Sequence, residues 1–243
     1  MRIVRAGQAI DTMVMSSMCD ENSYMSIPAI MDAFQDIAGI HASGVDTGAF
    51  ELEEIGLFWV VSKMRMVINR RPLVGEETQL STWILPSDKI VCERDCAIKK
   101  GNEMLAYCRC IWAALRRDNG RPEPMASFYP YPDEELQPPD DRPLKRMSRG
   151  FDDAEEIGSY TIRSVDIDRG GHMNNVNYVR AMLGCFSCEE IKEMNISEID
   201  MQFQLQCYEG ETIRFVKRPS DTAKMEIGAI NADGKTAFMA AIY

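Results

Sequence analysis

Long apolar runs, positive charge and histidine are scarce in this 243-residue sequence. No stretch approaches the roughly 18 consecutive apolar residues that a membrane-spanning helix needs, so we expect no stable membrane insertion. Lys and Arg number 27 against 38 Asp and Glu, which gives a formal net charge of −11. A general nucleic-acid binder has the opposite balance, so nucleic acid is not an expected partner.

Export and metal-binding signals are also missing. The first residues, MRIVRAGQAIDTMVMSS, lack a continuous apolar core and a cleavage site, so we predict a cytoplasmic protein with free cysteines. Cys185 and Cys188 have C-x-x-C spacing, but no second pair completes a zinc site, and we expect both thiols to pack within a helix. We expect neither a metal nor an organic cofactor. The only candidates for a catalytic imidazole are His41 and His172.

Proline is concentrated in one segment. Residues 122–143 hold seven of the 11 prolines among several acidic side chains, which disfavours helices and central strands. We predict that 122–150 is a linker between an N-terminal unit, 1–121, and a C-terminal unit, 151–243.

The two predicted units repeat one pattern of elements. Apolar spacing predicts a helix over about 27–42, after a Ser26 cap, and another over about 175–192. Strand-like segments follow each helix in the same order, at 74–85 and 90–115 and at 208–218 and 222–243. The two hairpin turns, at Gly101 and Gly234, are 133 residues apart, as a duplicated unit requires. We therefore predict an α+β fold of two tandem units, each a long helix covered by an antiparallel sheet.

The segment SVDIDRGGHMNNVNYVRAMLG, residues 164–184, carries the strongest functional signal. We expect a strand bearing Asp166 and Asp168 to run into a glycine pair and then into His172. A carboxylate at this position can act as a base or as a nucleophile. The residues alone leave a structural interpretation equally open, in which Asp168 caps a helix and His172 lies on the surface.

The start of the second predicted helix is part of the same signal. Asn174 or Asn175 is expected to cap this helix, whose first N–H groups can hold a developing oxyanion. Gly171 permits a close approach of the backbone to a ligand. We therefore expect Gly171, Asn174 and Asn175 to bind substrate.

The pattern D-x-x-G-H-x-N-N-x-x-Y, present from Asp168 to Tyr178, resembles the hot-dog thioesterases. The duplicated layout and the segment RRPLVGEETQLSTWILPSDKIVCERD are similar to the acyl-ACP thioesterases of bacteria and plants. The resemblance covers nearly the whole chain. It implies two tandem hot-dog units and hydrolysis of fatty acyl-ACP during fatty acid biosynthesis, with acyl carrier protein as the partner and no cofactor.

In that family the catalytic set is an Asp, an Asn two residues later, a His two residues further on, and a downstream Glu-Cys pair. Asp168 and His172 match, and Cys207 lies 35 residues after His172, as the pattern requires. Two positions depart from the pattern. Gly170 stands in place of the Asn, and Gln206 stands in place of the Glu.

These departures bear on the mechanism that the resemblance implies. We favour Asp168 as the base for water, or as a nucleophile, with His172 and helix N–H groups polarising the thioester carbonyl. Gln206 can position the water by a hydrogen bond but cannot take its proton. Cys207 as the nucleophile is the alternative, and a buried strand thiol is an equally open interpretation of this residue. Weak or lost activity is also consistent with the two departures.

In the family the first unit lines the acyl-chain tunnel, which implies that Met31, Phe34 and Trp59 contact the chain. Core packing is the alternative for each of them. We expect His41 to be a helix-terminal residue. Because acyl carrier protein is itself acidic, docking requires a local basic patch. The candidates are Lys63, Arg65, Arg70, Arg71, Arg116, Arg117, Arg121, Lys145, Arg146 and Arg149.

Two other functions are compatible with these sequence features. An acyl-CoA thioesterase on the same fold would differ in carrier preference, and a non-catalytic acyl-carrier-binding protein would bind without turnover. A hydratase on the same fold is a more distant alternative, because hydratases tend to present a different Asp–His spacing. Sheet edges on each unit make a homodimer an expectation as well.

Overall fold

A computed structural model describes residues 6–85, 89–129, 138–144, 146–148 and 150–243. The chain divides into two compact units, Met1–Pro143 and Leu144–Tyr243, which are described separately below. Several prolines and acids of the predicted linker, at 130–137, lie outside the described residues, as do Lys145 and Arg149. The linker boundaries given above stay a prediction.

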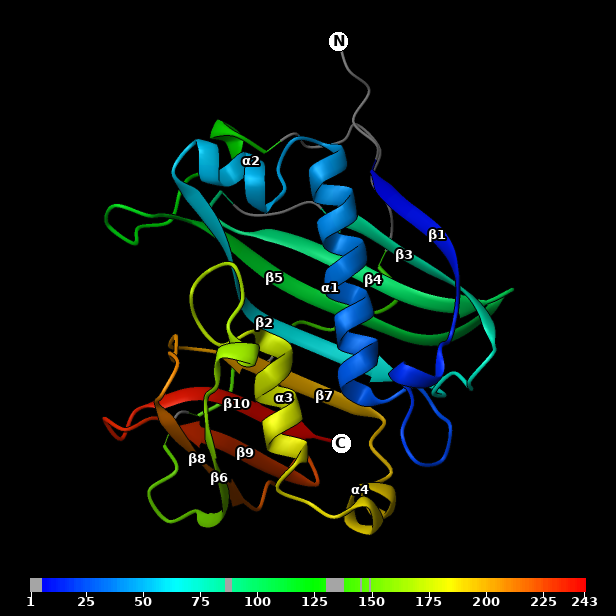
Figure 1. The fold of residues 1–243 in the computed structure, drawn as a ribbon, viewed down its shortest axis with the longest axis vertical. Coiled ribbons are helices and arrows are strands. Elements are labelled where there is room, and N and C mark those ends of the chain that lie inside the picture. Colours follow the sequence, from blue (N-terminus) through cyan, green and yellow to red (C-terminus); the bar gives the residue numbers. More distant parts are fainter. Residues whose placement is uncertain (1–5, 86–88, 130–137, 145, 149) are drawn as a thin grey trace. The chain divides into compact units, whose positions relative to one another are not determined.

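The first unit is an antiparallel sheet with a long helix across it (Figure 1). Its helices are α1 (Ile27–Gly44) and α2 (Ala49–Glu54), and its strands are β1 (Gly7–Met13), β2 (Leu57–Ile68), β3 (Glu77–Leu85), β4 (Cys92–Lys100) and β5 (Glu103–Arg116). The strand order is β1-β3-β4-β5-β2, and α1 packs against β1, β3 and β4. The core of the unit therefore lies between α1 and this sheet.

Helix α1 forms where the sequence predicts it. The Ser26 hydroxyl accepts a hydrogen bond from the Ala29 N–H at 3.2 Å, and Pro28 lies in the first turn. The buried side recurs at helical spacing through Ile30, Phe34 and Ile37. Capping and burial thus fix both the start and the orientation of the helix.

The second unit repeats this plan (Figure 1). Its helices are α3 (Asn175–Leu183) and α4 (Cys188–Met194), and its strands are β6 (Glu155–Thr161), β7 (Glu198–Phe203), β8 (Thr212–Arg218), β9 (Met225–Ile230) and β10 (Thr236–Ile242). The strand order is β7-β10-β9-β8-β6. Tyr178 of α3 stacks on Phe238 of β10, with ring centroids 5.5 Å apart, and this contact fixes the helix on the sheet.

The predicted hairpins are confirmed in both units. Strands β4 and β5 turn at Gly101, with φ of 58°, and the β9–β10 connection contains Gly234, with φ of 76°. A positive φ is easily adopted only by glycine, which explains the residue type at both turns.

The prediction of a single helix over about 175–192 is wrong, because two shorter helices form there. Gly184 ends α3, and Ser187 begins α4 with a capping box in which its hydroxyl accepts from the Glu190 N–H at 3.2 Å. Cys185 therefore lies in the connection and Cys188 is an exposed first residue of α4, so the two thiols do not pack within one helix.

The described part of the chain shows neither a cluster of metal ligands nor a membrane-spanning helix. All eight cysteines are free, and no group of three or more His, Cys, Asp or Glu side chains among the described residues could hold a metal ion. No helix in the described ranges is long and apolar enough to cross a membrane.

Candidate active site

The candidate site is a tight loop that leads into α3. Ile167 and Met173 form an isolated antiparallel bridge, and the Asp168 N–H donates to the His172 carbonyl at 3.0 Å. The Gly171 N–H donates to the Asp168 carbonyl at 3.0 Å, and Gly171 has a φ of 79°. The loop thus holds Asp168 and His172 side by side.

Contrary to the sequence prediction, Asp168 does not lie on a strand, and neither does Asp166. Asp166 ends a one-turn 3-10 helix, Ser164–Asp166, because its carboxylate closes that turn. Its Oδ2 accepts from the Arg163 N–H at 2.8 Å and from the Tyr160 hydroxyl at 2.9 Å. Asp166 is buried and its Oδ2 accepts two hydrogen bonds, so it supports the loop rather than facing solvent.

Asp168 has a carboxylate that remains partly accessible. Its side chain is 29% exposed, and Oδ1 accepts from the Gly170 N–H at 2.7 Å. The His172 Nδ1 lies 3.9 Å from this Oδ1, and the His172 Nε2 is buried with no hydrogen-bond partner among the described residues. The His172 Nδ1 also contacts the Met173 carbonyl at 3.4 Å. Asp168 is therefore the accessible member of the pair and is suited to act as a base towards a group supplied from outside.

Gly170 leaves the space in which the His172 and Asp168 side chains lie. A Cβ at residue 170 would lie 2.7 Å from the His172 Nε2 and 2.9 Å from the Asp168 Oδ1, closer than real Cβ contacts. The His172 ring therefore occupies the space that a side chain at 170 would need. A side chain at residue 170 would therefore move the His172 ring or the Asp168 carboxylate from the position it has here.

The start of α3 completes the loop. Asn174 is the cap, since its Oδ1 accepts from the Val176 N–H at 2.8 Å, while Asn175 is the first helical residue. The Asn175 N–H has no acceptor among the described residues. This N–H is therefore available to an oxygen placed at the positive end of the helix.

Cys207 and Gln206 lie on the segment beside the loop, but they differ in exposure. The Met173 N–H donates to the Cys207 carbonyl at 2.8 Å, which places this segment next to the residue after His172. The Cys207 side chain is buried, and burial raises the pKa of its thiol. Gln206 is exposed and accepts from the Tyr208 hydroxyl at 3.2 Å, and none of its described hydrogen bonds reaches Asp168 or His172.

Sequence reasoning missed a carboxylate next to this segment. Glu211 interacts with the Cys207 thiol, and its Oε2 accepts from the Tyr208 N–H at 3.1 Å. Glu76 makes the same turn contact in the first unit, where its Oε2 accepts from the Leu73 N–H at 2.9 Å. The repeated Gly-Glu in VGEET and YEGET is the signal that finds both residues, and the repetition indicates a turn-stabilising role.

The first unit contains a structural copy of the loop at the equivalent segment MCDENSYMS, residues 18–26, although the D-x-x-G-H sequence is absent there. The Asp20 N–H donates to the Tyr24 carbonyl at 2.8 Å, as Asp168 does to His172. The Asn22 N–H donates to the Asp20 Oδ1 at 3.0 Å, as Gly170 does to Asp168. In this copy, however, the carboxylate pairs with Arg71, and tyrosine replaces histidine. A free carboxylate beside an imidazole is thus found only in the second loop of this pair.

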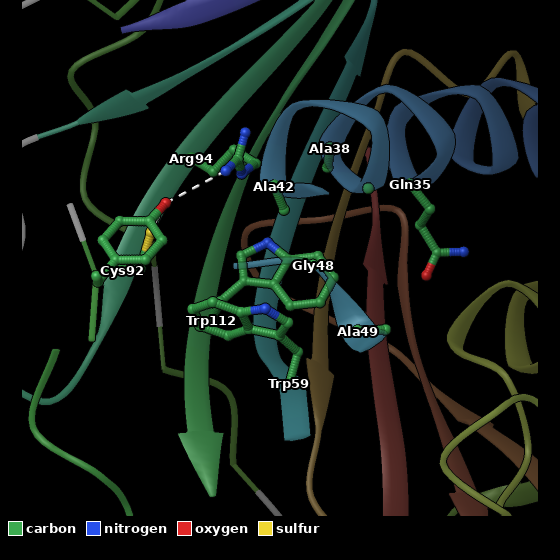
Figure 2. Close-up of a pocket in the computed structure, with 11 residues that line it drawn as sticks. Gln35, Ala38, Ala42, Gly48, Ala49, Trp59, Cys92, Arg94 and Trp112 are labelled. Carbon is green, nitrogen blue, oxygen red and sulfur yellow. Dashed lines mark hydrogen bonds between the residues drawn. The ribbon is translucent and has the colours of Figure 1, made fainter. Parts of the chain in front are cut away.

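The substrate-binding residues predicted in the first unit separate into two groups. Met31 and Phe34 are buried in the packed side of α1, and their contact with an acyl chain stays a prediction. Trp59 lines a cavity of about 180 Å³ between α1, β2, β4 and β5 (Figure 2). His41 is in the last turn of α1, as expected, but it is buried and contacts Arg94 at 3.0 Å.

Several candidates for a basic patch are neutralised by internal partners. Arg70 bonds both Glu76 and Glu103, and Arg71 pairs with Asp20. Further ion pairs join Arg65 to Asp140, Arg116 to Glu123 and Arg117 to Glu53. These pairs reduce the positive charge that the candidates present to an acidic partner.

Comparison with known proteins supports the resemblance of the motif. The family model described as the acyl-ACP thioesterase N-terminal domain matches residues 11–129, and the C-terminal domain model matches residues 151–239. The chain belongs to the acyl-ACP thioesterase family. The predicted family is therefore confirmed over most of the sequence.

Curated members of the acyl-ACP thioesterase family are distant relatives in sequence. A chloroplastic palmitoyl-acyl carrier protein thioesterase from Cuphea hookeriana is 27% identical over 203 residues, which cover 75% of this chain and 47% of the relative. A chloroplastic oleoyl-acyl carrier protein thioesterase from Coriandrum sativum is 23% identical over 242 residues, covering 89% and 64%. The chain spans about half the length of the first curated relatives that it matches.

Solved structures of the family share the fold. The 12:0-ACP thioesterase from Umbellularia californica has a TM-score of 0.85 at 20% identity and covers 100% of this chain and 98% of its own. An acyl-ACP thioesterase from Bacteroides thetaiotaomicron has a TM-score of 0.80 at 18% identity and covers 98% and 97%. The predicted α+β fold of two tandem hot-dog units is thereby confirmed.

Proposed function

We propose that this chain hydrolyses the thioester of a fatty acyl-ACP and releases a free fatty acid. The observation that carries the proposal is the pairing of an accessible Asp168 carboxylate with the His172 imidazole, whose Nδ1 lies 3.9 Å from the Asp168 Oδ1, just before the start of α3. Membership of the acyl-ACP thioesterase family supports the reaction class and the acyl-ACP substrate. The substrate requires a carrier protein as partner, and the cytoplasmic location and the homodimer remain predictions.

The proposed reaction uses Asp168 as the base. Asp168 takes a proton from a water molecule whose oxygen attacks the thioester carbonyl carbon. The oxyanion that forms accepts hydrogen bonds from the Asn175 N–H and from His172. When the intermediate collapses, the C–S bond breaks, and the proton held by Asp168 goes to the departing sulfur. Water and thioester thus give one acid and one thiol, without metal or organic cofactor.

Gly171, Asn174 and Gln206 have positioning roles in this proposal. The positive φ of Gly171 turns the chain between Asp168 and His172, and Asn174 orients the helix start by its capping bond. Gln206 carries no titratable carboxyl group, so its contribution is limited to orienting water or substrate from the exposed segment.

The alternative with Cys207 as the nucleophile has less support. A thiol attacks as its thiolate, and the burial that raises the pKa of Cys207 lowers the thiolate fraction near neutral pH. An attack by the Asp168 carboxylate on the carbonyl carbon remains chemically equivalent in outcome. It differs from the base mechanism because an acyl-enzyme anhydride forms and then reacts with water.

The substrate proposal is tested by measuring thiol release from a panel of acyl-ACPs and from the acyl-CoAs with the same chains. We expect turnover with a higher kcat/KM for the ACP series. A preference for the CoA series would assign the chain to the acyl-CoA alternative. Tight binding of acyl-ACPs without turnover of any substrate would instead show a non-catalytic acyl-carrier-binding protein.

A further inference from the structure

The cavity in the first unit has mostly apolar walls. Ala38 and Ala42 of α1, Trp59 of β2 and Trp112 of β5 contribute to them (Figure 2). Walls of this kind suit an aliphatic group of modest size, because the volume is about 180 Å³. Apolar walls alone do not determine whether the terminal group of such a ligand is apolar, polar or charged.

A buried arginine lies at the wall of this cavity (Figure 2). Arg94 is 4% exposed, and its guanidinium contacts three side chains. These contacts are with the His41 Nδ1 at 3.0 Å, the Thr82 hydroxyl at 3.1 Å and the Tyr129 hydroxyl at 3.2 Å. Burial raises the pKa of Tyr129 well above its ordinary value, so this hydroxyl stays neutral. The guanidinium therefore has no anionic partner among these three groups.

The charge of Arg94 is left uncompensated among the described residues. No carboxylate there forms an ion pair with it, and its Nε–H and one of its Nη2–H donors have no described acceptor. A buried cation without a counter-ion is costly, and a guanidinium presents paired donors that match a carboxylate. An anionic oxygen group in the cavity would remove this cost.

Trp112 supplies a second N–H donor on a residue that lines the cavity. Its indole Nε1 is buried and has no hydrogen-bond partner among the described groups, although the ring lines the cavity. Trp59, on the opposite strand of the β2–β5 pair, differs because its Nε1 donates to the Thr47 carbonyl at 2.8 Å. The ring of Trp112 thus brings an unsatisfied N–H to the lining that also contains Arg94, whose guanidinium has no described carboxylate partner.

We propose that this cavity binds a carboxylate carried on a short aliphatic chain. The carboxylate lies against the Arg94 guanidinium and within reach of the Trp112 Nε1–H, and the aliphatic part packs on Trp59 and the α1 alanines. Charge-assisted hydrogen bonds to a buried guanidinium give the site its selectivity, because an alcohol of the same length offers no charge.

Two molecules can supply such a carboxylate. One is a free fatty acid, which binds with its own head group in the cavity. The other is an acyl group that carries a second carboxyl at its far end while attached to a carrier, and this source rests on the proposed function.

The direct test is calorimetric binding of hexanoate and of hexan-1-ol to the full chain. We expect hexanoate to bind about tenfold more tightly than the alcohol, or better. Arg94→Met should abolish this preference, Arg94→Lys should retain part of it, and Trp112→Phe should weaken hexanoate binding. Trp83→Phe is the matched control, because the Trp83 Nε1 is also buried and unpartnered but Trp83 is not among the residues that line the cavity.

Equal binding of hexanoate and hexan-1-ol by the wild type, or no binding of either, would overturn the inference. A preference that survives in a folded Arg94→Met variant would do so as well. If Arg94→Met fails to fold, the test compares the hexanoate affinity of Trp112→Phe with that of Trp83→Phe. The site predicts weaker binding in Trp112→Phe and unchanged binding in Trp83→Phe, and any other result would overturn it.

Turnover measurements distinguish the two sources of the carboxylate, a free fatty acid and a carboxyl-ended acyl group on a carrier. Acyl-ACPs with a carboxyl or a methyl group at the far end of equal chains are compared, and hexanoate is tested as an inhibitor of the methyl-ended substrate. Preference for the carboxyl-ended chain identifies the substrate, whereas inhibition without that preference identifies a free acid. Hexanoate binding without hydrolysis of any acyl-ACP would reject the proposed function and leave this site standing.

Discussion

At the residue scale, Gly170 and His172 have to be considered together. The sequence shows Gly170 as a departure from the family pattern but gives no reason for it. In the folded loop the His172 Nε2 lies 2.7 Å from the position of a Cβ on residue 170, so a side chain there would move the imidazole. Sequence reasoning therefore found the residues of the loop, whereas the space they share is visible only in three dimensions.

Restoring the family residue at 170 should harm the enzyme. In Gly170→Asn the new side chain displaces the His172 ring from Asp168, and we expect kcat to fall by about a hundredfold with a smaller change in KM. Steady-state thiol release from an acyl-ACP measures both constants. Gly44→Ala is the control, because a Cβ there meets nothing within 4 Å. A rise in kcat for Gly170→Asn would contradict the shared-space interpretation.

The reactivity of cysteines provides a second prediction at this scale. Burial raises the pKa of the Cys207 thiol, whereas Cys188 is exposed. With iodoacetamide near pH 7.5 we expect Cys188 to be alkylated first and Cys207 to react appreciably only as the pH rises or the chain unfolds. Mass spectrometry of digests follows each site. Early alkylation of Cys207 with parallel loss of activity would favour Cys207 as the nucleophile.

At the element scale, helices were predicted correctly where the capping residues and the apolar periodicity agree. Helix α1 was predictable because a cap, a proline in the first turn and a continuous apolar stripe agree. The apolar stripe over 175–192 also looked continuous, yet Gly184 and the Ser187–Glu190 capping box divide it. That S-x-x-E pattern is readable in the sequence, so the error came from giving periodicity more weight than capping.

The turn before β3 makes a prediction about stability and pH. Hydrogen bonding from Arg70 holds the pKa of Glu76 at about 2, below its ordinary value of 4.5. Glu76→Gln should lower the free energy of unfolding by about 1–3 kcal/mol at pH 7. Because the native pKa is lowered, this contribution is complete above about pH 5 and is lost as the pH falls towards 2.

Urea unfolding of Glu76→Gln and wild type at pH 7, 5 and 3 measures this effect. Glu77→Gln is a matched control, since Glu77 is the adjacent residue and is exposed. A stability difference that stays constant down to pH 3 would show that the charge of Glu76 does not stabilise the turn.

At the scale of the whole molecule, duplication determines how many sites are expected. Both units contain the same loop, but in the first unit Arg71 pairs with Asp20 and Tyr24 stands at the histidine position. The first unit also lacks the D-x-x-G-H sequence, so one site per chain is expected. The structure adds the physical reason, since the carboxylate of the first loop is already neutralised. Sequence reasoning placed the equivalent segment at MCDENSYMS, residues 18–26, but the shared hydrogen bonds of the two loops are visible only in the structure.

Net charge gives a prediction for the encounter with the carrier. The chain carries a formal charge of −11, and several of its arginines are paired internally, so long-range attraction of an acidic carrier is not expected. Raising the salt concentration from about 20 to about 200 mM should leave KM for acyl-ACP unchanged or lower it, because screening reduces repulsion. Initial-rate measurements at several salt concentrations test this. A steep increase in KM would reveal a local basic docking patch.

The central claim is that one carboxylate, Asp168, performs the chemistry. Its most direct test compares kcat for acyl-ACP hydrolysis in Asp168→Asn and in Asp20→Asn, the same loop position in the first unit. We predict a loss of about a hundredfold to ten-thousandfold for Asp168→Asn, and less than about a twofold change for Asp20→Asn once folding is verified. Equal losses in the two variants, or full activity in Asp168→Asn, would contradict the assignment.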